Sequence, residues 1–204
     1  MIGVIDYGAG NLHSVRKSLD RLGLRSRLVS SPCELAGVRG VVLPGVGHFG
    51  AAAGELERRG LTAALKEWLA ADRPFLGICL GMQLLFEDSE ESDGRAPGLG
   101  AFRGNVVRLQ GPRRLHMGWS FVRSGALREG AGARGPDDWD FSGYYYFVHG
   151  YVAVPAEPGV VAAVAEYRRS FAAVVRRGNV LGVQFHPEKS GALGLRLLER
   201  WGKP

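Results

Sequence analysis

At residues 74–81 the chain reads Pro74-Phe75-Leu76-Gly77-Ile78-Cys79-Leu80-Gly81, which places a cysteine between an apolar segment and the start of a helix. The apolar run predicts a buried strand over Pro74–Ile78, and the residues that follow predict a helix over Leu80–Phe86. Glycine on either side of the cysteine permits close backbone packing at the turn. A strand that turns at once into a helix is the building unit of a parallel sheet covered by helices.

The first half of the chain alternates in the same way between strand and helix. Apolar patterning predicts three earlier strands, at Ile2–Ile5, Arg25–Val29 and Val38–Leu43. A helix is expected to open at Asn11, and two further helical stretches precede Pro74.

The second half of the chain predicts strands without long helices between them. They are expected at Val106–Leu109, Trp119–Val122, Tyr144–Val154, Val160–Tyr167, Phe171–Val175 and Val180–Phe185. Ser190 is expected to cap a last helix. The whole pattern predicts an α/β fold: a mainly parallel open sheet with helices on both faces, and antiparallel strands added in the second half.

Size and composition fit an ordinary globular protein. The 204 residues are expected to form one domain, 1–204, and 46% of them are hydrophobic. No run of about 18 apolar residues suggests a membrane span. The chain enters its first strand at Ile2 without the pattern of a signal peptide, so we expect a cytoplasmic protein. The segment Ser124–Asp140, rich in glycine and charge, is expected to form a long mobile loop, either a lid or a surface insertion.

Several classes of ligand find no support in the sequence. The net charge is +6, but the arginines are scattered and do not alternate with aromatic residues, so we interpret them as solvated faces and expect no nucleic acid. Gly8-Ala9-Gly10 lacks the third glycine of a dinucleotide motif, because position 13 is His13. His13, His48 and His116 lack the spacing of metal ligands. We expect neither a cofactor nor a metal.

Cys79 and His186-Pro187-Glu188 together contain a cysteine nucleophile, a base and an orienting carboxylate. The start of a helix and a nearby imidazolium both favour the thiolate, which is the attacking form. Pro187 favours an extended backbone at His186, so that His186 and Glu188 share a face. We expect the strand Val180–Phe185 to bring His186 to the cleft of Cys79. Taken alone, Cys79 could also be a buried residue that ends a core strand.

Two backbone regions are candidates for binding an oxyanion. The N–H of Leu80 would point at the oxygen of a bound carbonyl, as in a hydrolase elbow. Pro44-Gly45-Val46-Gly47 ends the preceding strand, and its free N–H groups make Gly45 and Val46 second candidates. A plain turn between strand and helix would explain the same residues equally well.

These residues resemble the triad (class I) glutamine amidotransferases, in particular the glutaminase subunits of imidazole glycerol phosphate synthase. The motifs that carry the resemblance span nearly the whole chain: Ile5-Asp6-Tyr7-Gly8-Ala9-Gly10-Asn11, Pro44-Gly45-Val46-Gly47-His48-Phe49, Gly77-Ile78-Cys79-Leu80-Gly81-Met82-Gln83, His116-Met117-Gly118-Trp119, Tyr145-Tyr146-Phe147-Val148-His149 and His186-Pro187-Glu188-Lys189-Ser190. The resemblance implies a flavodoxin-like fold and a glutaminase without cofactor or metal.

The resemblance also implies roles for single residues. Cys79 would attack the side-chain amide of glutamine, and His186, steered by Glu188, would protonate the departing ammonia. Leu80 and the peptide Gly45–Val46 would hold the oxyanion. The residues implied in substrate binding are Gly47, Gln83, Gly150 and Tyr151.

A partner is implied as well, namely a cyclase subunit of (β/α)8 type that receives the ammonia and forms imidazole glycerol phosphate in histidine biosynthesis. The heterodimer interface would include Asn11, Trp119, Tyr146 and Lys189. The chain departs from the family pattern at Ser120, where asparagine is usual, and at Gly150, where a hydroxyl residue is usual. Two alternatives stay open: a glutaminase subunit of an anthranilate or pyridoxal phosphate synthase, and a cysteine hydrolase or peptidase of similar fold.

Overall fold

The computed structural model describes residues 1–92, 96–110, 114–125 and 139–203. Most of the segment Ser124–Asp140, expected to be a mobile loop, lies outside these ranges. Within them, no helix combines the length and the apolar character that crossing a membrane requires.

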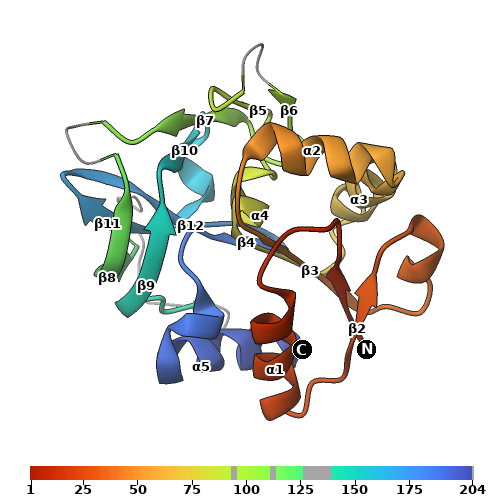
Figure 1. Ribbon diagram of the computed structural model, residues 1–204. Helices are drawn as coiled ribbons and strands as arrows, with labels where there is room; N and C mark the ends of the chain where they lie inside the picture. The colour runs from red at the N-terminus through yellow and green to blue at the C-terminus, as the bar shows by residue number, and fades with distance from the viewer. Residues whose placement is uncertain (93–95, 111–113, 126–138, 204) are drawn as a thin grey trace.

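A mixed central sheet organises the described residues in the strand order β2-β1-β3-β4-β13-β12-β11-β8-β9 (Figure 1). Its strands are β1 (Ile2–Ile5), β2 (Ser26–Val29), β3 (Gly40–Gly45), β4 (Phe75–Cys79), β8 (His116–Ser124), β9 (Gly143–His149), β11 (Val161–Tyr167), β12 (Arg169–Arg177) and β13 (Val180–Val183). The first five strands in this order, from β2 through β1, β3 and β4 to β13, pair in parallel. From β13 onward, each strand pairs with the next in antiparallel orientation. The predicted α/β fold class is confirmed.

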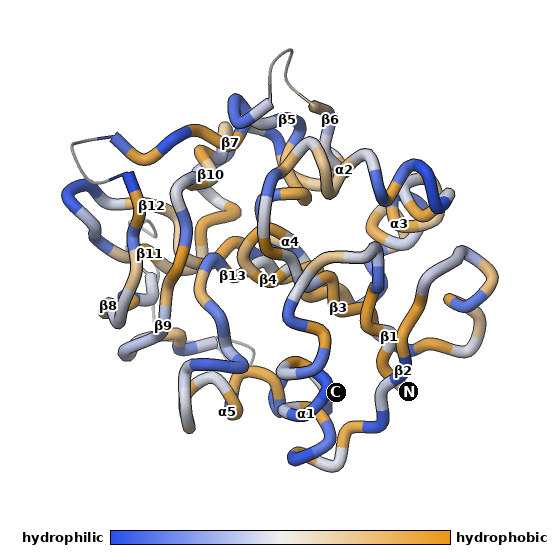
Figure 2. The backbone as a smooth tube through the Cα atoms, viewed as in Figure 1, coloured by the Kyte–Doolittle hydropathy of each residue, from blue (hydrophilic) through white to orange (hydrophobic). Residues whose placement is uncertain are grey.

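Helices cover both faces of this sheet. Helices α1 (Leu12–Arg21) and α5 (Gly191–Gly202) pack on one face, and α2 (Phe49–Arg58) and α3 (Leu61–Ala70) pack on the other (Figure 1). Neighbouring residues of β3 point to opposite faces, so Val41 joins the core under α2 and α3 while Val42 joins the core under α1 and α5. A strand buried on both faces is apolar throughout, as the hydropathy along β3 and β4 shows (Figure 2).

A small second sheet stands beside the first, in the order β10-β7-β5-β6. Its strands are β5 (Asp88–Ser89), β6 (Ala96–Pro97), β7 (Gly104–Arg108) and β10 (Tyr151–Pro155). The prediction of one strand over Tyr144–Val154 was therefore wrong, since β9 and β10 belong to different sheets. The chain changes sheets at Gly150, whose carbonyl accepts a hydrogen bond from Leu109 N at 2.9 Å.

The helix after Cys79 is shorter than the predicted Leu80–Phe86. It comprises a single turn, α4 (Leu80–Gln83). The carbonyl groups of Leu84, Leu85 and Phe86 accept hydrogen bonds from backbone N–H groups at residues 99–102, so a neighbouring loop takes the place of further helical turns.

Ser190 precedes α5 as predicted, but its side chain does not cap the helix. Its hydroxyl donates to His186 O at 2.6 Å and accepts from Tyr146 N at 3.0 Å. The serine therefore ties the connection between β13 and α5, including the short 3₁₀ segment η3 (Pro187–Lys189), to strand β9. Two further 3₁₀ turns are η1 (Pro32–Leu35) and η2 (Pro158–Val160).

Candidate active site

Cys79 ends β4 in a strained backbone conformation. Its φ of 54° and ψ of −109° lie in a region that residues other than glycine rarely adopt, at a cost of about 1–3 kcal/mol. The flanking glycines allow this sharp turn, because a Cβ on Gly81 would overlap the carbonyl oxygen of Leu43 and one on Gly77 would overlap the backbone of Gly81. The thiol is thus presented at the junction of β4 and α4.

His186 reaches the same end of the sheet because β13 pairs in parallel with β4, with Val183 opposite Ile78. Its backbone N–H donates to Tyr146 O at 2.9 Å. Nδ1 of His186 lies 2.8 Å from Oε1 of Glu188, and the two side chains are only 2% and 1% exposed. The carboxylate therefore fixes the ring with Nδ1 as the donor and leaves Nε2 for chemistry.

The imidazole of His186 is held in its charged form. Burial lowers its pKa, but the interactions with Cys79 and Glu188 outweigh burial and raise the pKa to about 10. Nε2 makes no well-aligned hydrogen bond to any described residue, although the sulfur is near enough to act on the ring. An imidazolium beside a thiol favours the thiolate, so the arrangement can supply a sulfur nucleophile and a proton donor.

A pocket of about 220 Å³ opens over the sulfur. Its wall is formed by Val46, Gly47, Cys79, Leu80, Gln83, Glu91, Val148, His149, Gly150 and Tyr151. Segments from both sheets and from the turn after β3 therefore meet at one cysteine. A concave site that places polar side chains, among them Gln83 and Glu91, around a nucleophile suits a small polar substrate.

The turn after β3 packs tightly against the turn that carries the cysteine. Gly45 pairs with Cys79 across the two strands. A Cβ on Gly45 would lie 2.7 Å from Leu80 Cβ, 2.8 Å from the Tyr7 hydroxyl and 2.9 Å from Gly81 N. Val46, which follows, is 41% exposed and lines the pocket. The N–H groups of this turn and of Leu80 are thus close to the sulfur.

Two glutamine side chains connect the pocket wall to the sulfur. Gln83 Nε2 donates to Tyr151 O at 2.9 Å and to Gln184 Oε1 at 3.1 Å. Gln184 Nε2 in turn lies 3.7 Å from Cys79 Sγ. Both N–H groups of Gln83 are therefore used within the protein, and its orientation is fixed.

The chain is similar to known proteins in sequence and in fold. The family described as "Glutamine amidotransferase class-I" matches residues 3–201. The chain belongs to the class I glutamine amidotransferases. It is 46% identical to "Imidazole glycerol phosphate synthase subunit HisH" of Desulfitobacterium hafniense, over 100% of this chain and 94% of that protein, and 48% identical to the HisH subunit of Moorella thermoacetica, over 99% and 94%. A crystal structure of a glutamine amidotransferase, 20% identical, superposes with a TM-score of 0.76, covering 100% and 99% of the two chains, which supports the fold.

The structure brings most of the predicted site residues of this amidotransferase together. Cys79, Leu80, Val46, Gly47, Gln83, Gly150 and Tyr151 line one pocket. His186 and Glu188 are buried beside it, and Gly45 packs against Leu80. The prediction that the ends of two strands would meet at one cleft matches this geometry.

Three of the four predicted interface residues form one surface cluster. The ring of Trp119 lies 6.1 Å from that of Tyr146, and Lys189 Nζ lies 5.9 Å from the Tyr146 ring. Asn11 precedes α1, which contacts η3, the 3₁₀ segment that carries Lys189.

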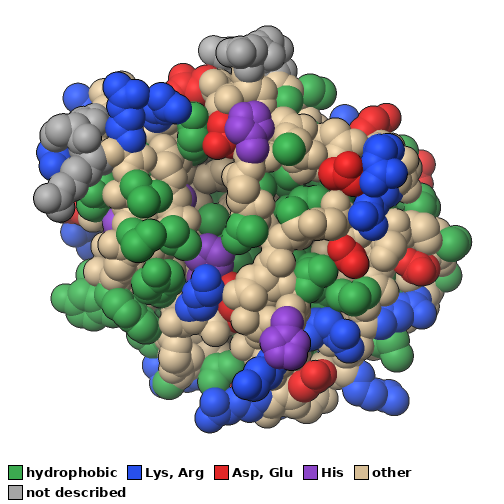
Figure 3. Space-filling model, viewed as in Figure 1, with side chains coloured by type: hydrophobic (Ala, Val, Ile, Leu, Met, Phe, Trp, Pro, Cys, Tyr) green, Lys and Arg blue, Asp and Glu red, His purple; other side chains and the backbone are tan. Residues whose placement is uncertain are grey.

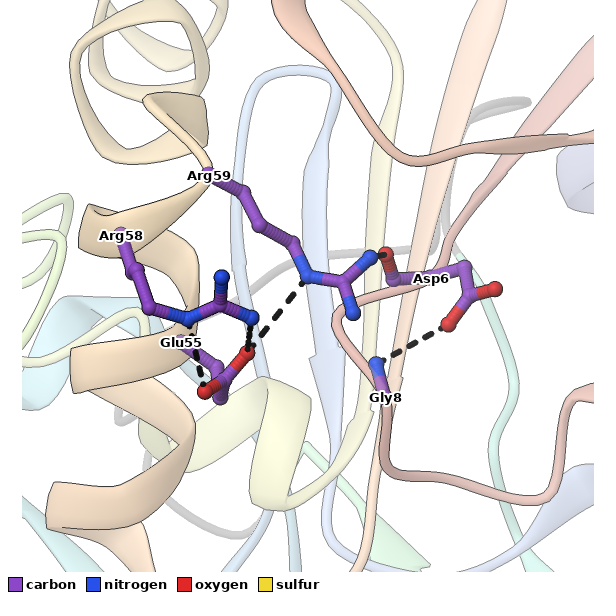
Figure 4. A network of polar contacts seen from close by, with 5 residues as sticks. All are labelled: Asp6, Gly8, Glu55, Arg58 and Arg59. Carbon is purple, nitrogen blue, oxygen red and sulfur yellow. Dashed lines mark hydrogen bonds and ion pairs between the residues drawn. The ribbon is translucent and has the colours of Figure 1, made fainter.

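The loop that carries Asn11 is anchored to the end of α2 (Figure 4). Arg59 Nη1 donates to Asp6 O at 2.9 Å, and Gly8 N donates to the Asp6 carboxylate at 2.9 Å. Glu55 holds Arg59 in place at 3.5 Å and also pairs with Arg58 at 2.6 Å. The connection between β1 and α1 is therefore tied to α2, the helix that follows the turn after β3.

Sequence reasoning missed several residues around the pocket: Tyr7, Glu91, His116, His149 and Gln184. Glu91 accepts a hydrogen bond from Phe49 N at 2.7 Å and lines the pocket. Tyr7 is fully buried, and no described residue hydrogen-bonds to its hydroxyl, whose pKa is raised by burial and by the charge of Cys79. Tyr7, His116 and His149 stand in motifs quoted for the family, but the sequence alone gave no sign of these contacts. Three-residue groups of His, Cys, Asp or Glu suited to a metal are absent from the described residues.

Proposed function

We propose that this chain is the glutaminase subunit of an imidazole glycerol phosphate synthase, hydrolysing L-glutamine to glutamate and ammonia. The observation that carries the proposal is the junction of Cys79 with the buried pair His186 and Glu188, in a chain that is 46–48% identical to HisH subunits along its length. The sequence identity is needed, because amidotransferases that serve different synthases share one fold and the fold alone does not distinguish them.

The first half-reaction forms a thioester. The Cys79 thiolate attacks the Cδ carbonyl carbon of glutamine, and the carbonyl oxygen takes the negative charge. When the tetrahedral intermediate collapses, the C–N bond breaks and the leaving nitrogen takes the proton of His186 Nε2, so that ammonia departs. Glu188 stabilises the imidazolium from Nδ1.

The second half-reaction regenerates the thiolate. A water molecule gives a proton to the now neutral His186 and attacks the thioester carbonyl carbon. The C–S bond breaks, glutamate leaves, and the pair of thiolate and imidazolium is restored. The raised pKa of His186, about 10, suits this return to the charged form at neutral pH.

The pocket offers groups for each part of glutamine. Gln83 and Gly47 would contact the bound substrate, and the backbone at Gly150 and Tyr151 would meet its amino-acid end. Glu91 adds a carboxylate to the same wall, which suits the α-ammonium group of the substrate. None of these roles requires a metal or an organic cofactor.

The oxyanion would be bound by Leu80 N–H and by the peptide Gly45–Val46. The exposure of Val46, 41%, distinguishes this turn from the buried strand before it. A turn that is free on one side can change the direction of a peptide plane, and we assign to it the dependence of glutaminase activity on the partner.

An exposed apolar face marks where the partner would dock. Met117, Trp119 and Phe121 alternate along β8 and are 61%, 55% and 50% exposed. They stand opposite Val148, Tyr146 and Tyr144 of β9. Figure 3 shows hydrophobic side chains gathered over these two strands. A large exposed apolar patch indicates an interface.

This docking face, made of the six side chains on β8 and β9, continues to the pocket, because Val148 belongs to both. A (β/α)8 cyclase seated on it would cover the mouth of the pocket and receive ammonia without release to water. Lys189, beside Tyr146, adds a positive charge at the edge of the same face.

The test is ammonia release from glutamine, measured for the chain alone, with the cyclase subunit, and with the cyclase and its aminoimidazole carboxamide ribonucleotide ligand. We expect little release from the chain alone and an increase of at least tenfold with both additions. Cys79→Ala should abolish release in every condition. Full activity of the isolated chain would refute dependence on the partner, and activity of the alanine variant would refute the assigned nucleophile.

A further inference from the structure

Two buried histidines outside the catalytic pair form a continuous hydrogen-bonded chain. His116 Nδ1 lies 3.0 Å from His149 Nε2, although the residues belong to different strands, β8 and β9. On one side, His116 Nε2 lies 2.8 Å from Ser120 Oγ. On the other side, His149 Nδ1 lies 2.9 Å from Tyr151 O, which belongs to the wall of the glutamine pocket.

The direction of this chain is set at its end. A carbonyl oxygen can only accept, so His149 Nδ1 carries a hydrogen and donates to Tyr151 O. In a neutral imidazole the other nitrogen then accepts, so His116 Nδ1 donates to His149 Nε2. By the same argument His116 Nε2 accepts from the Ser120 hydroxyl. Each ring nitrogen is therefore either a donor or an acceptor, and the donors point in one direction from Ser120 to Tyr151.

Both rings are neutral at physiological pH, as this direction requires. Burial lowers the pKa of His116 to about 4. Burial lowers the pKa of His149 to about 3, with a smaller contribution from the repulsion that a charged His149 would meet from His116 and His186, and the hydrogen bond to Tyr151 offsets this only in part.

The Tyr151 carbonyl, which accepts from His149 at the pocket end of the hydrogen-bonded chain, also accepts from a second donor. Tyr151 O also accepts from Gln83 Nε2, whose remaining hydrogen goes to Gln184 Oε1. His149 and Gln83 therefore hold one carbonyl from two sides, and the carbonyl in turn fixes the Gln83 amide. Since the Gln83 N–H groups are both used, its side-chain oxygen is the part left to meet a ligand.

We propose that His116 and His149 are positioning residues which, by holding the Tyr151 carbonyl against Gln83, set the affinity of the pocket for glutamine. The proposal rests on the proposed glutaminase function. The two rings touch no reacting atom; they act through the backbone of Tyr151 and the amide of Gln83. Their loss should raise KM for glutamine more than it lowers kcat.

The variant His116→Phe separates the hydrogen bond from the packing. The His116 ring stacks on Phe147 at 4.8 Å and on Tyr167 at 4.3 Å between ring centroids, and phenylalanine can keep both contacts. It leaves Nε2 of His149 without a donor. We expect KM for glutamine to rise about three- to tenfold, as for one lost hydrogen bond, with kcat changed less than twofold.

The matched control is Tyr167→Phe. Tyr167 lies in the same aromatic cluster, and the variant loses one hydrogen bond, from the Tyr167 hydroxyl to Leu115 O at 3.1 Å. The hydrogen bonds from Ser120 to Tyr151 stay intact. We expect its KM to equal that of the wild type. Both variants are assayed with the cyclase and its ligand at saturation, and binding of glutamine to each is also measured in a Cys79→Ala background.

The direction of the chain has its own readout. Nitrogen-15 NMR of histidine-labelled wild-type protein should show a hydrogen on Nδ1 and none on Nε2 for both His116 and His149. A hydrogen on Nε2 of either ring would overturn the proposal. This measurement does not depend on catalysis, so it remains decisive if the wild type releases no ammonia and the proposed function fails.

Other outcomes also decide the matter. An unchanged KM and glutamine affinity in folded His116→Phe would overturn the positioning role. An equal rise of KM in Tyr167→Phe would show that loosening of the aromatic cluster controls the affinity for glutamine, and would overturn the role of the hydrogen bonds between His116 and His149. If glutamine binds to none of the Cys79→Ala proteins, the pocket does not take glutamine and the proposal is overturned together with the function.

Discussion

Nδ1 of His186 and Oε1 of Glu188 lie 2.8 Å apart in a place that solvent hardly reaches. Replacing Glu188 with Gln keeps the shape but removes the negative charge that stabilises the imidazolium. We expect kcat for glutamine hydrolysis to fall about 10²–10⁴-fold, the usual contribution of acid–base catalysis, with a small change in KM. Steady-state kinetics with the partner at saturation measure both constants.

The control for this variant is Glu199→Gln on α5, which removes an exposed ion pair to Lys203. Its activity should equal that of the wild type, since exposed pairs contribute little. A Glu188→Gln protein that keeps its fold and its kcat would show that the carboxylate does not orient the base.

The pH dependence of the free energy of unfolding should also report the charge on His186. Interaction with Cys79 and Glu188 raises the pKa from 6.5 to about 10 against the effect of burial. A group whose pKa is raised on folding stabilises the protein fully below its unfolded pKa and loses that effect as pH rises through its folded pKa. We expect the stability excess of wild type over His186→Asn to shrink from pH 6.5 to pH 10 in urea unfolding.

The comparison needs a histidine that makes no such pair. His13 is exposed on α1, so His13→Asn removes an imidazole without touching the pair of His186 and Glu188, and its stability should stay within about 0.5 kcal/mol of the wild type in urea unfolding. A constant difference between wild type and His186→Asn over the same pH range would contradict a raised pKa.

The strain at Cys79 predicts that two inactive variants differ in stability. Cys79→Gly and Cys79→Ala should both be inactive, because each lacks the sulfur. Glycine accepts a φ of 54° without penalty, so we expect Cys79→Gly to be about 1 kcal/mol more stable than Cys79→Ala in urea unfolding. Equal or reversed stabilities would mean that the turn holds no strain.

The geometry of the candidate site was accessible from the sequence because short motifs fix it locally. The tight turn at Cys79 requires glycine at 77 and 81, and Pro187 extends the chain so that Glu188 faces His186. The pairing of β4 with β13, which joins the two motifs, follows the general rule that parallel strands end at one edge.

The rest depended on contacts between distant segments, which no local pattern encodes. Apart from His149 and Gly150, Tyr144–Val154 consists of aromatic and aliphatic residues, so periodicity could not show that the chain changes sheets at Gly150. The helix after Cys79 ends at Gln83, and the carbonyl groups of Leu84, Leu85 and Phe86 accept hydrogen bonds from a distant loop, residues 99–102, in place of further helical turns. The pair of His116 and His149 arises from the register of β8 and β9, in which these residues are opposite each other.

The docking face predicts a clear separation of binding from folding. Trp119 is 55% exposed, so its replacement by alanine should change the free energy of unfolding of the isolated chain by less than about 0.5 kcal/mol. A buried aromatic anchor at an interface contributes about 2 kcal/mol or more, so Trp119→Ala should weaken cyclase binding at least about tenfold in titration calorimetry. Leu28→Ala, on β2 at the opposite edge of the sheet, should bind as the wild type does. Equal affinities for Trp119→Ala and wild type would place the partner elsewhere.

The contact between Gly45 and Tyr7 predicts that substitutions at these two residues are energetically coupled. Gly45→Ala would push a methyl group to 2.7 Å from Leu80 Cβ and 2.8 Å from the Tyr7 hydroxyl, and we expect it to cost about 1–3 kcal/mol of stability and most of the activity. Tyr7→Phe removes a buried hydroxyl that no described residue satisfies, so it should leave stability unchanged or higher. In the Tyr7→Phe background one of the overlaps is gone, and Gly45→Ala should then cost at least about 0.5 kcal/mol less. Strictly additive effects in this double-mutant cycle, measured by urea unfolding, would contradict the contact.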